Sequence, residues 1–304
     1  MHETGRRALR ALALFATGGL TCLGLALASA GEAKSQEVEP NEFVSAPAGT
    51  NLLLGYYIYG HETEFNVRGG PTIKNSGYEA NIGVARYVHY FDVAGHPANL
   101  QILQPFGSLS GAHIDGERLG SAFGAQNTIL IASFWPYSNA ANKTYVVGSI
   151  FLYPPSGSYD PRSPINLGDN RLSGAAQIGI TKGIGSRFSF DAAFDATFYA
   201  DNTDYFPGGQ RLSQNPTYRG QLWLSWAWSK AFSTSIGWEG LFGGRQNLDG
   251  NFTGNSSEEQ RLRAAAQLFL SPTIQTTLEL NHDVEHSGNF KQDFGALFRV
   301  LYIF

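Results

Sequence analysis

Apolar and polar residues alternate with a period of two over much of this chain. The clearest run, from Phe188 to Ala200, reads FSFDAAFDATFYA. Phenylalanine and alanine occupy one set of alternate positions, and serine, aspartate and threonine occupy most of the other. Successive side chains of a β-strand point to opposite faces, so the run predicts a strand with one apolar and one polar face. It is longer than the roughly five or six residues of an ordinary strand.

Similar runs recur along the chain, less cleanly in its first half. We expect about twelve strands, near residues 50–59, 80–91, 98–106, 123–135, 144–153, 171–182, 188–200, 218–229, 232–242, 261–270, 274–283 and 294–304. The predicted connections alternate in length, and the long ones fall near 60–79, 107–122, 154–170, 202–217 and 243–260. Only the last connection, 286–291, breaks this size pattern. Short turns at one end and long loops at the other are typical of up-and-down membrane barrels.

The composition agrees with an all-β protein. Aromatic residues make up 13% of the chain, charged residues only 15%, and there are 36 glycines. A soluble sandwich would bury the apolar phase against a second sheet, whereas a membrane barrel would turn it towards lipid. The strand lengths match the about 9–11 residues that cross a bilayer, and tyrosine and tryptophan gather near strand ends. The sequence therefore predicts one transmembrane antiparallel up-and-down β-barrel over residues 50–304.

The N-terminus has the pattern of a secretory signal peptide. Three arginines precede an apolar stretch that ends in Ala28-Ser29-Ala30, so we expect cleavage near Ala30 and a short periplasmic segment over residues 31–49. Cys22 and Met1 are the only cysteine and methionine, and both lie in the predicted signal peptide. Without residues 1–30, the 21 basic and 25 acidic residues become 18 and 24, a net charge of −6. This balance does not favour a nucleic acid as partner.

The end of the chain resembles Gram-negative outer-membrane proteins, whose last strand is read by the barrel assembly machinery. Four alternate residues match that assembly signal: Phe298, Val300, Tyr302 and Phe304. A narrower resemblance is to the transporter family named for the MetA pathway of phenol degradation. It rests on APAGTNLLLGYY at Ala46–Tyr57, PPSGSYDP at Pro154–Pro161 and NLGDNR at Asn166–Arg171. The sequence departs from that family at Gly124-Ala125-Gln126-Asn127, where members often carry a Gly-Asp pair.

The resemblance implies an outer-membrane barrel that takes up aromatic or other hydrophobic compounds. Its partners would be the outer-membrane bilayer, the barrel assembly machinery and a small hydrophobic solute. Polar-phase residues in the second half of the chain are the candidate lumen: Asp191, Asp195, Tyr199, Arg219, Trp223, Glu239, Arg261, Arg263, Glu279, Asp283 and Arg299. The charged members predict either a filter for solutes or an internal salt-bridge network that plugs the barrel. The sequence leaves both open.

The sequence gives little support for an enzymatic or metal-binding site. His282 and His286 lie four residues apart, but a strand running into a turn does not bring such residues together as a helix would. The chain has no G-x-S-x-G motif, so a lipid hydrolase is the least favoured alternative. We expect no cofactor, no metal and no catalytic residue. The main hypothesis is a passive channel for small hydrophobic compounds, and the main alternative is a structural or ligand-binding barrel with a plugged lumen.

Overall fold

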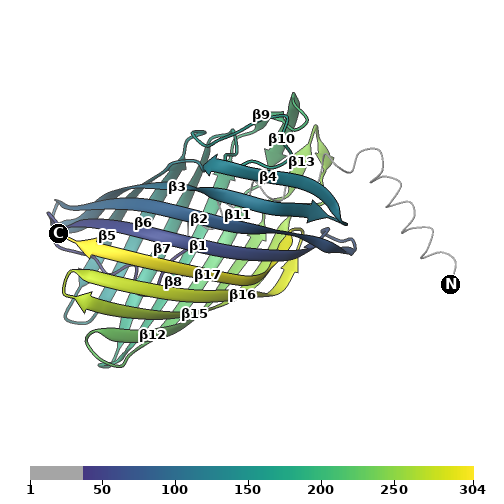
Figure 1. Ribbon diagram of the computed structural model, residues 1–304. Helices are drawn as coiled ribbons and strands as arrows, with labels where there is room; N and C mark the ends of the chain where they lie inside the picture. Colours follow the sequence, from purple (N-terminus) through teal and green to yellow (C-terminus); the bar gives the residue numbers. More distant parts are fainter. Residues whose placement is uncertain (1–36) are drawn as a thin grey trace.

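The computed structural model describes residues 37–304, which form a single antiparallel barrel with a small accessory sheet (Figure 1). The barrel strands are β1 (Asn51–Asn66), β2 (Thr72–Val93), β3 (His96–Ile114), β5 (Ile129–Asn139), β6 (Thr144–Tyr153), β7 (Ser173–Ile184), β8 (Phe188–Tyr199), β11 (Thr217–Ala227), β12 (Phe232–Gly243), β15 (Ser257–Ser271), β16 (Ile274–Ser287) and β17 (Phe290–Ile303). Strand β4 (Glu117–Ala125) pairs beside β3. Residues 37–304 contain no helix that is long and apolar enough to cross a membrane.

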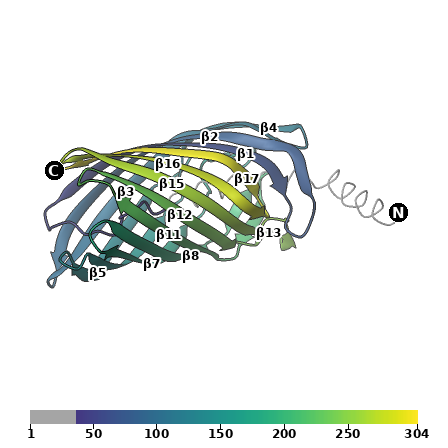
Figure 2. The ribbon, with the colours of Figure 1, turned by 90° about the horizontal axis from the view of Figure 1, so that it is seen from below.

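The barrel closes because the last strand pairs with the first. Strands β1 and β17 run antiparallel from Leu52↔Ile303 to Phe65↔Phe290. Neighbouring strands follow one another around the wall, which makes a closed twelve-stranded antiparallel barrel as the alternation predicts. Closure pairs the first and last strands so that the barrel has no open side, while β4 pairs with β3 alone. Figure 2 shows that the strands are inclined to the barrel axis, as closure requires.

The two faces of the wall differ as the sequence pattern predicts. On β17, Phe298, Val300 and Tyr302 are exposed on the outside, whereas Arg299 is buried on the inside. Exposed large apolar side chains occur on all twelve barrel strands. So extensive an apolar surface on a closed barrel is the surface that lipid covers.

Long loops and short turns lie at opposite ends of the barrel. We call them the loop end and the turn end; Phe304 lies at the turn end, and its backbone exchanges hydrogen bonds of 2.8 and 2.9 Å with that of Asn51. The strands continue beyond their predicted limits at the loop end, where β9 (Asn202–Tyr205), β10 (Gln210–Gln214), β13 (Gln246–Leu248) and β14 (Asn251–Phe252) form the accessory sheet (Figure 1). The predicted long loops are therefore partly strand.

One predicted strand is divided in two. Residues 123–135 were expected to be continuous, but β4 ends at Ala125 and β5 begins at Ile129. Strand β4 pairs with β3 towards the loop end, and β5 pairs with β3 towards the turn end. Residues 126–128 therefore connect two strands that lie beside different parts of β3.

The N-terminal segment lies inside the barrel. Residues 37–46, which we call the luminal segment, contact side chains on the inner face of β11, β15 and β5. We expected a periplasmic segment over 31–49; residues 37–46 lie within the lumen instead, and residues 1–36, with the predicted signal peptide, lie outside the described part. The sequence of residues 37–46 is rich in glutamate and does not alternate between apolar and polar residues. It therefore gave no reason to predict that the segment lies inside the barrel.

The four residues of the predicted assembly signal are all exposed on the outer face, and Phe304 is the last of them. We expect deletion of Phe304 to lower the amount of assembled protein while leaving the transport rate per assembled barrel unchanged, because the Phe304 ring makes no part of the lumen. The heat-modifiable fraction on an unboiled gel measures assembly, and Phe304→Tyr, which keeps an aromatic end, is the control. Equal assembly of the deletion and the unaltered chain would contradict the prediction.

Candidate functional site: the barrel lumen

The backbone of the luminal segment is held by side chains from distant strands. Trp223 Nε1 donates to the carbonyl oxygen of Val38 at 2.7 Å, and the Val38 amide donates to Gln221 Oε1 at 2.8 Å. Further along, Trp135 Nε1 donates to the Phe43 carbonyl oxygen at 2.8 Å. Buried indoles need a hydrogen-bond acceptor, and here the segment supplies it. These hydrogen bonds hold the segment in one defined position within the pore.

A cluster of buried charges anchors the start of the segment. Arg263 forms a two-point pair with Glu279, with nitrogen–oxygen distances of 2.8 and 2.9 Å, and neither side chain is exposed to solvent. Arg261 pairs with Asp283 at 2.7 Å and with Glu37 of the segment at 3.1 Å. Because fixed two-point pairs satisfy several donors at once, they suit a buried site. The cluster joins β15, β16 and the segment into one network.

A second charged group lies nearer the turn end. Glu42 of the segment pairs with Arg86 at 2.8 Å and with Arg299 at 3.3 Å. Arg86 also donates to Tyr56 Oη at 3.0 Å and to Gln101 Oε1 at 2.6 and 2.9 Å. These partners place Arg86 in the lumen. The segment therefore bridges β2 and β17 as well.

The carboxyl of Glu39 lies among these charges. Its side chain is buried, with Glu279 as a neighbouring carboxylate and Arg299 and Arg263 as neighbouring cations.

Asp191 and Asp195 face the lumen from β8. Asp191 accepts from the backbone amide of Asn41 at 3.1 Å and from the Thr181 hydroxyl. Asp195 lies opposite Arg219 in the β8–β11 register. The eleven residues predicted to face the lumen all lie on the inner face, and all but half-buried Tyr199 are buried. The structure joins most of the charged ones through the luminal segment.

The lumen has two unlike halves. The inner face of β8, β11, β12, β15 and β16 carries most of the charged and polar side chains just described, and Arg86 of β2 and Arg299 of β17 lie outside this group. The inner face of β1, β2, β3, β5 and β6 carries mainly apolar ones, among them Leu52, Leu54, Val88, Leu103, Ile131, Val147 and Phe151. We call this second surface the apolar wall. The luminal segment touches both halves: its Val38 and Phe43 belong to one buried cluster with Leu54, Val88 and Val147, and the apolar wall beside them borders open space.

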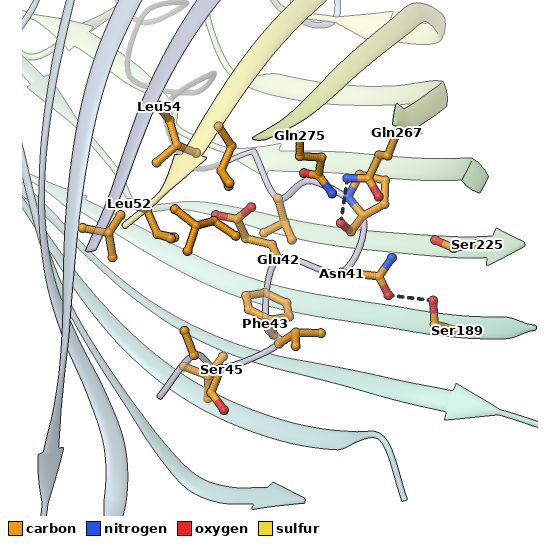
Figure 3. A pocket seen from close by; sticks show the side chains of 18 of the residues that line it. Asn41, Glu42, Phe43, Ser45, Leu52, Leu54, Ser189, Ser225, Gln267 and Gln275 are labelled. Atoms are coloured by element: carbon orange, nitrogen blue, oxygen red, sulfur yellow. Dashed lines mark hydrogen bonds between the residues drawn. The ribbon is translucent and has the colours of Figure 1, made fainter. Parts of the chain in front are cut away.

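That space is a cavity of about 660 Å³ beside the segment. Figure 3 shows Asn41, Glu42, Phe43 and Ser45 of the segment, with Leu52 and Leu54 on one side and Ser189 and Ser225 on the other. The dashed lines mark the bonds from Gln267 Nε2 to the Pro40 carbonyl oxygen, at 3.1 Å, and from the Ser189 hydroxyl to Asn41 Oδ1, at 2.7 Å. At the turn end, Lys143, Arg187 and Lys230 line the rim. A cavity of this size accommodates a small organic molecule.

One glycine lets the segment approach the wall closely. A Cβ atom at Gly179 of β7 would lie 2.4 Å from the ring of Phe43. No real Cβ tolerates that distance, so the Phe43 ring can occupy its place only because residue 179 has no side chain. Phe43 is itself buried.

Sequence reasoning missed the luminal segment and the apolar wall. Glu37, Glu42 and Phe43 belong to a stretch without period, and the partners that hold them are far away in sequence. The apolar wall was hidden because both faces of β5 and β6 are largely apolar, as in Ile129-Leu130-Ile131, and alternation then vanishes. Two inward indoles, Trp135 and Trp223, were the available signal, since each needs an acceptor that a bare lumen lacks.

Comparison with solved structures gives the class of protein. The COG4313 outer membrane channel from Pseudomonas putida F1 matches with a TM-score of 0.84 and 26% identity, over 88% of this chain and 100% of that chain. The transport unit of the autotransporter AIDA-I from Escherichia coli matches at a TM-score of 0.50 and 10% identity, over 93% and 98% of the two chains, which shows a shared fold alone. The protein has the fold of a Gram-negative outer-membrane channel.

The family follows from the sequence itself. Residues 63–299 match the family model described as "Putative MetA-pathway of phenol degradation", and the chain belongs to that family. This confirms the family resemblance, and two of the three stretches that suggested it, Pro154–Pro161 and Asn166–Arg171, lie within the matched residues. No curated protein matches the chain.

Proposed function

We propose that the protein lies in the outer membrane, with its turn end in the periplasm, and lets small hydrophobic or aromatic molecules pass inward without an energy source. The observation that supports this most is the apolar wall beside the 660 Å³ cavity. A channel for ions or sugars would surround its path with polar side chains. An apolar solute needs no polar partner, and its transfer from water to a surface of leucine, isoleucine and valine is favourable. The family's association with phenol degradation points the same way.

In this proposal the two halves of the lumen have different tasks. The charged half, with Arg261, Arg263 and their carboxylates, holds the luminal segment and the strand register. The segment narrows the pore so that water and ions have little room. The apolar wall and the cavity then offer the solute a path between the segment and β1–β6.

The proposal is tested in cells whose outer leaflet is lipopolysaccharide, which slows hydrophobic probes. We expect cells that produce the protein to take up N-phenyl-naphthylamine, a probe that fluoresces in phospholipid, several-fold faster than cells carrying an empty vector. Folded protein is quantified by heat modifiability so that rates are compared per barrel. Uptake equal to that of the vector control would refute the proposed function.

A pair of single substitutions tests the role of the apolar wall. Ile131→Asn places an amide on the apolar wall, and we expect several-fold slower probe uptake because the solute must then leave a polar group unpaired. Ser233→Asn places the same amide on the polar side of the same cavity and serves as the matched control, with little change expected. Equal uptake by the two variants would show that the path does not follow the apolar wall.

The second candidate is a ligand-binding barrel with a filled lumen, which the many bonds of the luminal segment favour. It predicts saturable binding of the probe to purified protein without faster uptake by cells. The uptake assay therefore separates the two candidates.

A further inference from the structure

Three cations lie on neighbouring turns at the turn end of the barrel. Lys143 ends the β5–β6 turn, Arg187 ends the β7–β8 turn, and Lys230 belongs to the β11–β12 turn. Strands β5, β6, β7, β8, β11 and β12 are consecutive around the wall, so the three turns form one arc of the rim. All three side chains line the cavity. We call Lys143, Arg187 and Lys230 the basic rim.

Backbone hydrogen bonds join these turns to the neighbouring strands. The Gly183 amide donates to the Lys143 carbonyl oxygen at 2.7 Å, and the Ala227 amide donates to the Arg187 carbonyl oxygen at 2.8 Å. The first bond links the β5–β6 turn to β7, and the second links the β7–β8 turn to β11. The basic rim therefore lies on one continuous part of the wall.

One glycine lets the Lys143 side chain lie against the inner face of the wall. Gly183 is four residues after Gly179 on β7, and Gly179 faces Phe43 of the luminal segment, so Gly183 also faces inward. A Cβ atom at Gly183 would lie 2.5 Å from Lys143 Cβ and 2.6 Å from Lys143 Cδ. The aliphatic part of Lys143 therefore occupies the place of the missing side chain, and its Nζ lies 3.5 Å from the Ser186 carbonyl oxygen.

The cavity carries an excess of positive charge. Its charged lining consists of five cations and two carboxylates: Glu37, Glu42, Arg86, Lys143, Arg187, Lys230 and Arg299. Arg86 and Arg299 pair with Glu42, and Glu37 pairs with Arg261 of the buried cluster. Within residues 37–304, no member of the basic rim forms an ion pair with a carboxylate. The chain as a whole has a net charge of −4, so the basic rim is opposite in sign to the protein that carries it.

The apolar wall and the basic rim line one and the same cavity. The wall offers leucine, valine and isoleucine side chains to the hydrocarbon part of a solute, and the rim offers ammonium and guanidinium groups to an acidic part. All three cations of the rim are exposed, so a carboxylate beside them keeps part of its hydration. An anion bound there therefore avoids the large cost of burying an unpaired charge.

Other ligands fit this arrangement less well. A cleft lined by charges of one sign concentrates ligands of the opposite sign, so a cationic amphiphile would be repelled by the rim. Contact with the phosphates of membrane lipids needs cations on the outer face, where Lys182 lies. Lys182 follows Thr181, which faces inward and bonds to Asp191, and Lys182 is not part of the cavity lining. The inward position of the basic rim favours a solute inside the cavity.

We propose that the cavity binds small aromatic or aliphatic carboxylates, with the hydrocarbon part against the apolar wall and the carboxylate at the basic rim. This inference rests on the proposed function and names the substrate class within it. Because the proposed function places the turn end in the periplasm, the carboxylate of a bound solute faces the periplasm.

A matched pair of compounds tests the substrate class. Phenylbutyrate and phenylbutanol have closely similar hydrocarbon parts, and only the first is acidic. Calorimetry on the folded protein in a non-ionic detergent, corrected for titration into the detergent alone, measures the Kd of each compound. We expect a several-fold lower Kd for phenylbutyrate at low ionic strength. The difference should shrink at high ionic strength, because salt screens exposed charges.

Single substitutions assign the preference to the basic rim. Lys230→Met and Arg187→Met should each raise the Kd of phenylbutyrate several-fold and leave the Kd of phenylbutanol unchanged. Combining both with Lys143→Met should remove the difference between the two compounds. Lys182→Met is the matched control, since it removes a lysine at the same end of the barrel that lies outside the cavity lining, and neither Kd should change. All four positions are outside the buried charge cluster, and heat modifiability verifies that each variant is folded.

The outcomes separate the substrate class from the channel. Equal Kd values for the two compounds, or no binding of phenylbutyrate, would overturn the inference, and faster uptake of N-phenyl-naphthylamine than by vector cells would then leave the proposed function standing. Equal effects of Lys182→Met and Lys230→Met would also overturn the inference, because the preference would then reflect the overall charge of the protein. Uptake of N-phenyl-naphthylamine equal to that of vector cells would overturn the proposed function instead.

Discussion

Deleting residues 37–46 is expected to raise the single-channel conductance of the protein several-fold. The luminal segment fills the centre of the pore, and its removal leaves a twelve-stranded barrel with only wall side chains inside. The main chain of the segment currently occupies space that hydrated ions need. Conductance in planar bilayers at a fixed salt concentration measures the effect, with folded protein verified by heat modifiability.

A single substitution should give a smaller change in the same direction. Gly179→Leu forces the Phe43 ring away from β7, because even a Cβ would lie 2.4 Å from that ring. Gly148→Leu is the matched control, since no atom lies within 4 Å of the Cβ position there. Conductance unchanged by both the deletion and Gly179→Leu would contradict the assignment of the segment as the element that narrows the pore.

Arg263→Ala is expected to lower the free energy of unfolding by about 3–5 kcal/mol, the usual cost of removing one partner from a buried ion pair. Glu279 would be left buried and uncompensated, close to the further carboxylates Glu37 and Glu239, which now lie 3.8 and 3.7 Å from the Arg263 guanidinium. Denaturant unfolding in detergent or lipid measures the loss. The segment should loosen too, because Arg263 Nη1 donates to the Val38 carbonyl oxygen at 3.2 Å.

Two controls make this prediction specific. Arg68→Ala removes an exposed pair with Glu258 and should cost only about 0–1 kcal/mol. Arg263→Met together with Glu279→Leu removes both charges and should recover most of the lost stability, since a buried pair can be replaced by apolar residues with little net cost. Equal losses for Arg263→Ala and Arg68→Ala would show that the buried network does not stabilise the barrel.

The sequence was sufficient for the barrel and for the inward charges of its second half. In β8 and β17 one face is apolar and the other polar, so alternation alone assigns Asp191 and Arg299 to the lumen. The same reasoning fails for β5 and β6, where lipid outside and an apolar wall inside both select apolar residues. The division of residues 123–135 into β4 and β5 was also beyond a pattern argument, because Asn127 and Thr128 are hydrogen-bonded to a loop about thirty positions away in the chain.

The luminal segment shows a different limit. Its residues form no regular element, and its position depends on acceptors and charges offered to β2, β5, β11, β15 and β17 at once. The sequence raised two readings of the inward charges, a filter and an internal network. The structure joins most of them in a network that includes the segment.

The most direct test of the account locates the solute inside the protein. A crystal of the protein soaked with a bromine-substituted benzene would reveal the solute by the anomalous scattering of bromine. We predict a bromine position between the luminal segment and the apolar wall, within van der Waals contact of Leu103 or Ile131. A bromine position confined to the charged half near Arg261, or a lumen that binds no bromobenzene at a saturating concentration, would contradict the claim that an apolar path runs through this barrel.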